Sequence, residues 1–434
     1  MPPEAGSTPS TPALIVNGVP WFDDRGRTVN AHGACIVADG ERYYLFGEYK
    51  TDDENRFIGF SCYSSPDLAT WTFERLVLPP QPGGLLGPGR IGERVKVMRC
   101  PSTGRFIMLM HTDDLGYSDP QIGLASSDTV NGEYTFHGAL THGGEPIRGW
   151  DMGTFIDRDG NGYLLLHEGD VYRLSEDYTV AEQKVVSGVA PGGESPAMLE
   201  RDGIYFLLFS NKTSWDRNDN YYLSAPALAG PWTHRGLLAP AGSLTWNSQC
   251  TFVLDLPVDG AAVPMYMGDR WSFPHQASAA TYVWLPITVD GTSLTLGEYW
   301  PAWDVARVQP VPPESVFDGP PIEVTFRSEG PGDAVDVPFA GTQVALVGTA
   351  DDHGGYALVE IRDYSGALVA SLLIDLYAGA AESGLRYVGP ELPRGEYSVR
   401  VTVTGDGSVF YKKDGTRLGT KGCRVALDRL LVRA

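Results

Sequence analysis

Four polar residues stand at the start of otherwise apolar stretches of this chain, where a strand would present one side chain to a cavity. They are Glu93 in GERVKVM, Asp151 in GWDMGTF, Glu194 in GGESPAM and Gln249 in TWNSQCTF. Apolar surroundings raise the pKa of a carboxyl group, and a general acid needs a raised pKa. Cleavage of a glycosidic bond needs such an acid, and a second group that activates water or attacks the sugar. A single acidic residue at such a place is more often a turn or cap residue, so the hypothesis depends on the four coming together.

Aromatic side chains are a second sign of sugar chemistry. The chain has 10 Trp, 21 Tyr and 16 Phe, and sugar rings stack their C–H faces on such side chains while polar neighbours bind the hydroxyls. Four tryptophans have Asp, Asn, Ser or Arg beside them, namely Trp150, Trp215, Trp246 and Trp271. Packing between strands is the other role open to each of them.

The elements that must position these residues recur five times along the chain. A hydrophobic, tyrosine-rich strand ends in a small or polar residue, as in YYLFGE (43–48), FIMLMH (106–111), GYLLLHEG (162–169), IYFLLFSN (204–211) and PMYMGDRW (264–271). Repeats of roughly 40 to 65 residues made only of short β runs are typical of antiparallel blades stacked around one axis. We therefore predict an all-β fold with a five-bladed β-propeller, in which the four polar residues meet near the axis.

The recurrence stops near Trp303, and the proline-rich run VQPVPPES (308–315) is typical of a hinge between domains. Beyond it, short strands with closely spaced turn signals predict a smaller β-sandwich of jelly-roll type. The predicted division is a disordered tail over 1–12, a propeller catalytic domain over 13–311 and a C-terminal β-sandwich accessory domain over 312–434.

Composition excludes several classes of function. Lys and Arg number 33 against 54 Asp and Glu, for a net charge of −21, which disfavours nucleic acid and is compatible with a neutral partner such as a sugar. The oligo- or polysaccharide partner is expected from the proposed chemistry, not from the charge. The five cysteines form no Cys-x-x-Cys pair, so neither a zinc site nor a disulfide framework is expected. No apolar run is long enough to span a membrane, and no signal peptide is recognisable. The oligomeric state stays open, and a secreted or extracytoplasmic location is expected from function alone.

Several motifs in one order resemble glycoside hydrolase family 43, and more narrowly its exo-β-1,3-galactanase (galactan 1,3-β-galactosidase) branch. The motifs are NAHGA (30–34), YLFGE (44–48), SCYSSPDLATW (61–71), ERVKV (93–97), ESPAM (194–198), LAGPW (228–232), TWNSQ (245–249) and MGDRW (267–271). The resemblance implies a five-bladed propeller that inverts the anomeric centre. It implies Glu194 as the general acid, Glu93 as the acid that tunes and orients it, and Asp151 as a substrate contact. Ser195 and Val95 depart from the Ala and Pro that are more usual there.

Most of that family places an Asp base on the first inner strand, where this chain reads NAHGA. The galactanase branch is similar in lacking this Asp and in placing a Gln in its T-W-x-S-Q motif, which implies that Gln249 orients the attacking water. A neutral amide can accept through its oxygen and donate through its nitrogen, but it is too weak a base to deprotonate water unaided.

Substrate contacts are expected at Glu48, Asp151, Tyr117, Trp246, Trp215, Asp269, Arg270 and His32. His32 could instead hold an ion or a water near the axis, or bond within the core. No cofactor is expected, and no ligand cluster is specific enough to assign a metal or a structural calcium. The C-terminal domain lacks Trp, so sugar binding and mere bracing of the propeller are both open.

Two other functions compete with a β-1,3-galactanase. An arabinofuranosidase or a β-galactofuranosidase could use the same propeller, because specificity depends on loops and a few hydroxyl contacts. A catalytically silent carbohydrate-binding propeller is the alternative of another class, and the missing Asp base favours it. The presence of Glu93, Asp151, Glu194 and Gln249 together argues against it, since a lectin needs no buried acid.

Overall fold

The computed structural model describes residues 13–434, so the tail predicted for residues 1–12 lies outside the described residues. The described chain is almost entirely β, as predicted, and its two short helical elements, α1 (Leu244–Asn247) and α2 (Gln276–Ala279), span four residues each. Residues 244–247 all have positive φ angles between 50° and 57°, so α1 is a single left-handed turn. None of the helices in residues 13–434 has the length and apolar character needed to cross a membrane.

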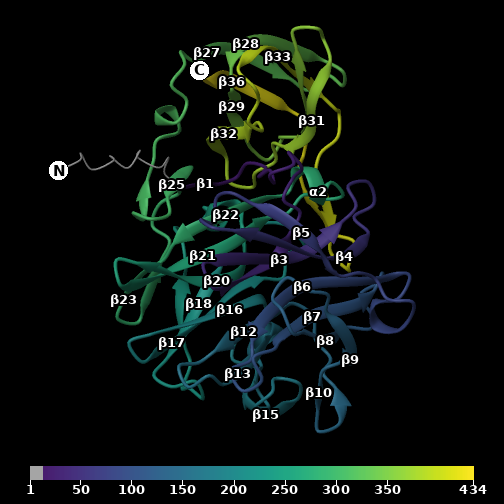
Figure 1. Ribbon diagram of the computed structural model, residues 1–434, viewed down its shortest axis with the longest axis vertical. Helices are drawn as coiled ribbons and strands as arrows, with labels where there is room; N and C mark the ends of the chain where they lie inside the picture. Colours follow the sequence, from purple (N-terminus) through teal and green to yellow (C-terminus); the bar gives the residue numbers. More distant parts are fainter. Residues whose placement is uncertain (1–12) are drawn as a thin grey trace, which may run out of the picture.

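Five sheets follow one another along the amino-terminal part of the chain (Figure 1). The first sheet contains β2 (His32–Asp39), β3 (Arg42–Lys50), β4 (Phe57–Ser65) and β5 (Thr72–Leu78), and the second contains β6 (Arg90–Arg99), β7 (Phe106–Asp114), β8 (Gln121–Ser127) and β9 (Thr135–Ala139). The third contains β10 (Thr141–His142), β11 (Glu145–Pro146), β12 (Met152–Ile156), β13 (Gly162–Leu166), β14 (Val171–Leu174) and β15 (Ala181–Val186). The fourth contains β16 (Gly193–Arg201), β17 (Ile204–Asn211), β18 (Tyr221–Ala225) and β19 (Thr233–Leu237), and the fifth contains β20 (Gln249–Val258), β21 (Ala261–Arg270) and β22 (Thr281–Pro286).

One edge strand of each sheet contacts the corresponding strand of the next, and these contacts close into a ring. The strand β2 contacts β6, β6 contacts β12, β12 contacts β16, β16 contacts β20, and β20 contacts β2 again. The first and last parts of this region also pair, because β1 (Leu14–Val16) is antiparallel to β25 (Ala302–Asp304). Residues at equivalent ends of the five inner strands therefore lie around one axis.

Each pair of neighbouring sheets is held together by its own apolar cluster, which is where the hydrophobic runs of the sequence are buried. Typical members are Phe46 and Met108 between the first and second sheets, Leu109 and Leu164 between the second and third, Leu165 and Leu207 between the third and fourth, Leu208 and Val283 between the fourth and fifth, and Leu45 and Trp284 between the fifth and first. The ring is therefore stabilised sheet against sheet, which leaves the axial ends of the inner strands free to carry polar side chains.

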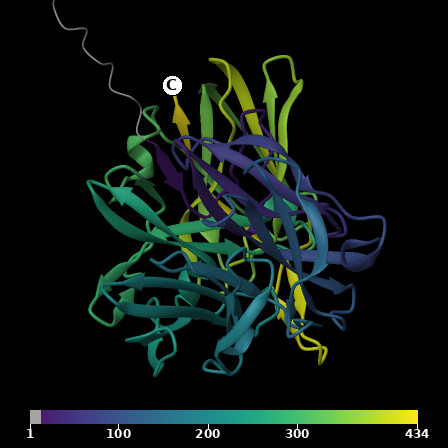
Figure 2. The same cartoon turned by 60° about the horizontal axis from the view of Figure 1, so that its bottom comes forward.

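The carboxy-terminal part contains two further four-stranded sheets around one apolar cluster. One has the order β27 (Ile322–Ser328), β36 (Val425–Arg433), β29 (Gln343–Ala350) and β32 (Glu382–Val388), and the other has the order β28 (Ala334–Gly341), β33 (Gly395–Val403), β30 (Tyr356–Asp363) and β31 (Leu368–Asp375). A hairpin of β34 (Val409–Tyr411) and β35 (Arg417–Gly419) extends from them toward the ring (Figure 2). The remaining short elements are β23 (Thr288–Asp290), β24 (Ser293–Thr295), β26 (Gln309–Pro310) and the 3-10 turns 84–86, 167–169 and 313–315.

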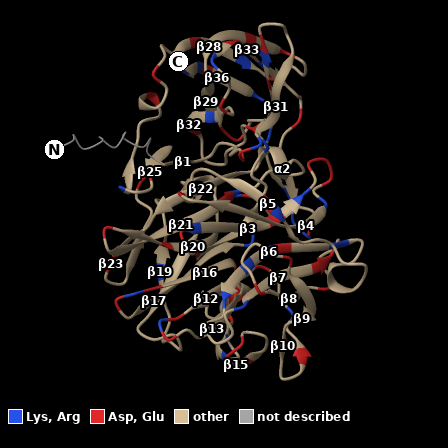
Figure 3. Ribbon diagram, in the orientation of Figure 1, with Lys and Arg blue, Asp and Glu red and all other residues tan. Residues whose placement is uncertain are grey.

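The two parts are joined by partly buried polar contacts. Arg270 at the end of β21 donates from Nη1 to Glu382 Oε1 (2.7 Å) and from Nη2 to Glu382 Oε2 (3.0 Å), and Tyr377 OH donates to Asp216 Oδ1 (2.8 Å). Charged residues of both signs are interspersed over the strands and loops of both parts (Figure 3).

Candidate active site

A cavity of about 530 Å³ lies where the inner strands of the ring end. It gathers polar and aromatic side chains from all five sheets and from the carboxy-terminal hairpin, among them Glu48, Glu93, Arg94, His111, Tyr117, Trp150, Asp151, Glu194, Lys212, Trp215 and Trp271. A hollow of about 550 Å³ at the opposite ends of the same strands is lined largely by apolar residues and by charged residues near the surface. Buried carboxylates are concentrated at the first end, so we assign the candidate active site there.

The same local irregularity positions the polar residues of four sheets. The pairing of the inner strand with its neighbour shifts register after His32, Glu93, Glu194 and Cys250. Such β-bulges bend a strand and redirect a side chain, and they are frequent beside active sites. Backbone φ angles of 62° at Gly33, 54° at Arg94 and 56° at Ser195 mark the bulges in three of these strands.

Glu194, the second residue of β16, has the environment of a general acid. It is 9% exposed, and burial together with the negative charge of Asp151 raises its pKa to about 8. The positive charges of Arg94 and Lys212 and a hydrogen bond from Gln249 lower the pKa of Glu194, but by less than burial and Asp151 raise it. Glu194 is therefore protonated near neutral pH and can donate a proton. The resemblance implied that Glu93 tunes this acid, whereas the carboxylate that raises the pKa of Glu194 is Asp151.

Gln249 lies beneath the cavity wall, 1% exposed, with all its polar atoms engaged. Its Nε2 donates to Glu194 Oε1 (3.1 Å) and Ser210 Oγ (2.8 Å), while its Oε1 accepts from Arg94 Nη2 (2.5 Å) and Trp271 Nε1 (2.8 Å). A carbonyl oxygen has two lone pairs, and both are used here. The oxygen that was expected to bind the attacking water is thus bonded within the protein in this geometry, and Gln249 is a partner of Glu194.

A second group of charges in the cavity wall is held by Lys50, which lies behind it. Its Nζ lies 2.6 Å from Glu93 Oε1 and 3.0 Å from Glu48 Oε2, and Tyr117 OH donates to Glu93 Oε1 (2.9 Å). Burial alone would raise the pKa of Glu93, but Lys50 and His111 outweigh it and hold that pKa well below its usual range. Burial raises the pKa of Glu48 to about 7 despite Lys50, and the charge of Glu93 adds to this rise. One carboxylate is therefore firmly ionised while its neighbour titrates near neutrality.

Asp151 forms an ion pair with Arg94, whose Nε lies 3.4 Å from Asp151 Oδ1. Ser195 Oγ donates to Asp151 Oδ2 (3.0 Å), so the Ser that replaces the more usual Ala supplies a hydrogen bond. Trp215 also lines the cavity, beside Phe273 with ring centroids 4.8 Å apart. The structure thus brings together six of the sequence-predicted residues at the cavity, namely Glu48, Glu93, Tyr117, Asp151, Glu194 and Trp215.

His32 and Asp269 lie behind the cavity rather than in its wall. His32 Nδ1 is 3.1 Å from Asp269 Oδ1, with both side chains at most 1% exposed, and Asp269 Oδ2 accepts from the Gly33 amide (3.2 Å). The His32 ring stacks on Tyr282 with a centroid distance of 4.4 Å. The prediction of direct substrate contacts is therefore corrected for both residues, and their hydrogen bonds within the core hold the first bulge in place.

Trp246 and Arg270 lie at the contact between the two parts of the chain. Trp246 Nε1 donates to Leu296 O (3.3 Å), and Trp246 O accepts from Arg270 Nη2 (2.9 Å). Arg270 directs its guanidinium at Glu382. The predicted substrate contacts are thus corrected for these two residues as well, because Trp246 bonds within the ring and Arg270 is used in docking the carboxy-terminal part.

Several residues in or behind the cavity wall were missed by the sequence analysis. Arg94, which lines the cavity, and Lys50, which pairs with Glu48 and Glu93 behind it, had a usable signal, since a basic residue within an apolar strand needs a buried partner. Lys212 and residues 409–413, which also line the cavity, had none, because only the folded chain brings this hairpin to the ring.

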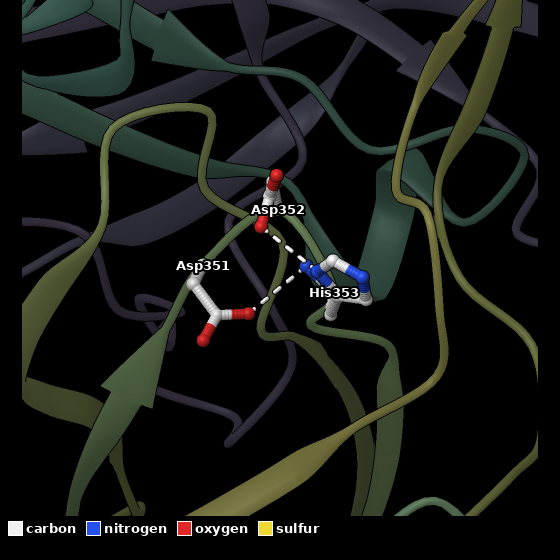
Figure 4. Close-up of side chains that lie close together, drawn as sticks. All are labelled: Asp351, Asp352 and His353. Carbon is white, nitrogen blue, oxygen red and sulfur yellow. Dashed lines mark hydrogen bonds and ion pairs between the residues drawn. The ribbon is translucent and has the colours of Figure 1, made fainter.

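Asp351, Asp352 and His353 form a group whose ligand atoms all lie within 4.8 Å of one another (Figure 4). The group belongs to the carboxy-terminal part and does not line the cavity. Arg424 pairs with Asp351, and Lys421 Nζ lies 2.6 Å from Asp352 Oδ2. These cations already compensate the carboxylates, so we assign no metal there.

Comparison with known proteins gives consistent results. The family model for glycosyl hydrolases family 43 matches residues 29–236. A candidate exo-β-1,3-galactanase from Bifidobacterium bifidum is 32% identical, with 64% of this chain and 95% of that chain covered and a TM-score of 0.59. An exo-β-1,3-galactanase from Phanerochaete chrysosporium, solved with galactose, is 25% identical over 96% of this chain and 99% of its own, with a TM-score of 0.68. A β-D-galactofuranosidase from Aspergillus niger is 27% identical over 236 residues, which are 49% of this chain. The match covers 63% of that relative, which is less than two thirds of its length.

Proposed function

The chain belongs to glycoside hydrolase family 43, and on this premise we propose that it is an inverting, exo-acting hydrolase. It releases galactose from the non-reducing end of β-1,3-galactan, the main chain of arabinogalactan. The observation that carries the proposal is Glu194, a carboxyl group with a pKa of about 8 in the wall of an aromatic-lined cavity. Two structural relatives named as exo-β-1,3-galactanases support the choice of sugar.

The proposed architecture is a five-bladed β-propeller over residues 13–311 followed by a β-sandwich over residues 312–434. The closed succession of inner-strand contacts supports the propeller, and the two sheets around one apolar cluster support the sandwich. Because its substrate is a polysaccharide, the protein is proposed to act outside the cytoplasm.

Glu194 protonates the glycosidic oxygen as the bond breaks. The amide nitrogen of Gln249 can only donate to Glu194 Oε1, so the proton of the neutral carboxyl group sits on the other oxygen. Gln249 is therefore a positioning residue that fixes which oxygen of the acid carries the transferable proton.

Inversion also needs an acceptor for the proton of the attacking water. The oxygen of Gln249 is already occupied, whereas Glu48 lines the cavity with a pKa of about 7. Glu48 comes from the first sheet, in which the resemblance places the base of most family members. We assign the acceptor role to Glu48, with Glu93 and Lys50 setting its charge state.

The remaining cavity residues bind the terminal sugar. Glu93, Asp151 and Tyr117 offer oxygen acceptors for its hydroxyls, and Trp215 offers an apolar face. A β-galactofuranosidase is the second candidate, favoured by the curated relative of that name. The two functions differ in the ring form of the sugar that this pocket must fit.

Product analysis tests the proposal. The protein is incubated with β-1,3-galactan, β-1,3-galactobiose and a panel of aryl galactosides, galactofuranosides and arabinofuranosides. We expect galactose from the first two, and the first-formed anomer by NMR should be α. A β anomer refutes inversion, preferential cleavage of a furanoside selects the second candidate, and binding without release of any sugar refutes the hydrolase.

A variant tests the role of the acid. Glu194→Gln removes the transferable proton at nearly constant shape, so turnover should fall by at least ~100-fold while galactose still binds. Near-normal turnover removes Glu194 from this role.

A further inference from the structure

The carboxy-terminal hairpin is part of the cavity wall. Residues 409–413, from β34 and the turn after it, line the same cavity as Glu194 and Asp151. The hairpin leaves the carboxy-terminal sheets and reaches the ring (Figures 1 and 2). Phe410 is buried, but Tyr411 is 62% exposed. One part of the chain therefore completes a site whose acids come from the other part.

Hydrogen bonds fix this hairpin against the ring at both of its ends. Near its base, the Gly419 amide donates to Asp216 Oδ2 (3.3 Å), and the same carboxylate accepts from Tyr377 OH. Near its tip, Lys413 Nζ donates to Tyr117 O (3.0 Å). The hairpin is thus held in a defined position at the cavity rather than resting on the surface.

The groups around the hairpin suit a sugar. Trp150 lines the cavity, with Lys413 Nζ 5.7 Å and Lys212 Nζ 5.3 Å from its ring centroid. Tyr411 adds a second, exposed aromatic ring. Because His167 stacks on Trp150 and the two lysines lie over its ring, the exposed aromatic ring here is that of Tyr411. This ring and the ammonium donors match the apolar face and hydroxyl oxygens of a pyranose.

The exposed fraction of the lining side chains increases from the floor of the cavity to its mouth. The catalytic carboxylates are almost covered, with Glu48 2% and Glu194 9% exposed, whereas Tyr411 and Lys413 of the hairpin are exposed. In an exo-acting site the terminal sugar occupies the covered floor, so the rest of the chain must leave past the mouth.

We propose that the hairpin of residues 409–419, with Trp150 and Lys212, forms a saccharide subsite for the sugar unit on the leaving-group side of the cleaved bond. This inference rests on the proposed function, because it takes the covered floor as the site of the terminal galactose. The carboxy-terminal part then selects oligosaccharides over single sugars.

The test compares a long and a short ligand in the full-length protein with Glu194→Gln, in which turnover is strongly reduced. Calorimetry measures the affinity for β-1,3-galactotriose and for galactose. Adding Tyr411→Ala or Lys413→Met should weaken galactotriose binding by about fivefold to tenfold and change galactose binding by less than twofold. Tyr364→Ala is the matched control, since Tyr364 is an 87% exposed tyrosine of the same part that does not line the cavity, and it should change neither affinity.

A second readout uses the active protein. Tyr411→Ala should lower kcat/KM for galactotriose by about fivefold. It should leave kcat/KM for β-galactosyl fluoride within twofold, because fluoride is too small to reach the hairpin. Unchanged galactotriose binding in both variants overturns the inference, and so does an equal loss for galactose and galactotriose. If the parent Glu194→Gln protein binds neither sugar, the proposed function itself fails, and this appears before any hairpin residue is changed.

Discussion

Changing one charge near Glu194 should move the alkaline limb of the pH dependence of kcat/KM, in a direction set by the sign of that charge. This limb reports the pKa of the general acid in the free enzyme. With a pKa of about 8, about 90% of Glu194 is protonated at pH 7, whereas a carboxyl group at its ordinary value would be protonated in only about 0.3% of molecules. The raised pKa is therefore what makes the acid available.

Two variants of opposite sign test this reasoning. Asp151→Asn removes the negative charge that, after burial, raises the pKa of Glu194 most, so the limb should move to lower pH by about one pH unit, or about 1.4 kcal/mol. Lys212→Met removes a positive charge that lowers the same pKa, so its limb should move to higher pH. The second shift should be smaller, because Lys212 is partly exposed and already pairs with Glu168.

The assay is kcat/KM for an aryl β-galactoside between pH 5 and pH 10. Asp151 also contacts substrate in the proposed function, so the position of the limb is compared and not its height. The reasoning is refuted if Asp151→Asn leaves the limb in place or if both variants move it in the same direction.

Three other variants test the remaining groups. Glu48→Gln should remove the acidic limb expected near pH 7 and lower kcat/KM by at least ~100-fold; persistence of that limb assigns it elsewhere. Gln249→Met removes a hydrogen bond that lowers the pKa of Glu194, so the alkaline limb should move to higher pH, which a residue that only orients water would not cause. Burial alone would raise the pKa of Glu382, but Arg270 and Arg386 lower it from 4.5 to about 2. This stabilises the fold by about 3 kcal/mol above pH 4.5, and the contribution is lost as the pH falls toward 2. Urea denaturation of Glu382→Gln should therefore show a deficit at pH 7 that disappears near pH 2, and a deficit independent of pH contradicts the linkage.

The sequence predicted the all-β fold and the meeting of Glu93, Asp151 and Glu194 for one physical reason. Each stands at the same point of a repeated apolar strand, and a closed succession of such strands brings equivalent points together. Hydrogen-bond direction has no such signal. Whether Gln249 turns its oxygen to the cavity or to Arg94 and Trp271 depends on donors that come from other sheets.

The motif MGDRW shows why neighbouring motif residues were assigned too broadly. Successive side chains of a strand point to opposite faces, so Asp269 and Arg270 cannot both face one cavity. Asp269 points to His32, and Arg270 points the other way to Glu382, 112 residues later in the chain. Trp271 comes back to the side of Gln249. Alternation alone could have separated these roles, but the identity of the distant partner could not be read from the motif.

The sequence left two roles open for the carboxy-terminal part, bracing of the propeller and sugar binding. In this structure the two roles depend on each other. A hairpin can select a ligand only if it is held at a fixed place relative to the catalytic acid. The Arg270 pair with Glu382 fixes the sheets from which the hairpin extends, and the bonds of Asp216 and Tyr117 fix its base and its tip. Arg270 follows Asp269, which pairs in register with Gln249, the partner of Glu194. The end of β21 thus both docks the carboxy-terminal part and supports Gln249, which holds Glu194 in place. A variant that loses this docking should therefore lose oligosaccharide selection and acid catalysis together.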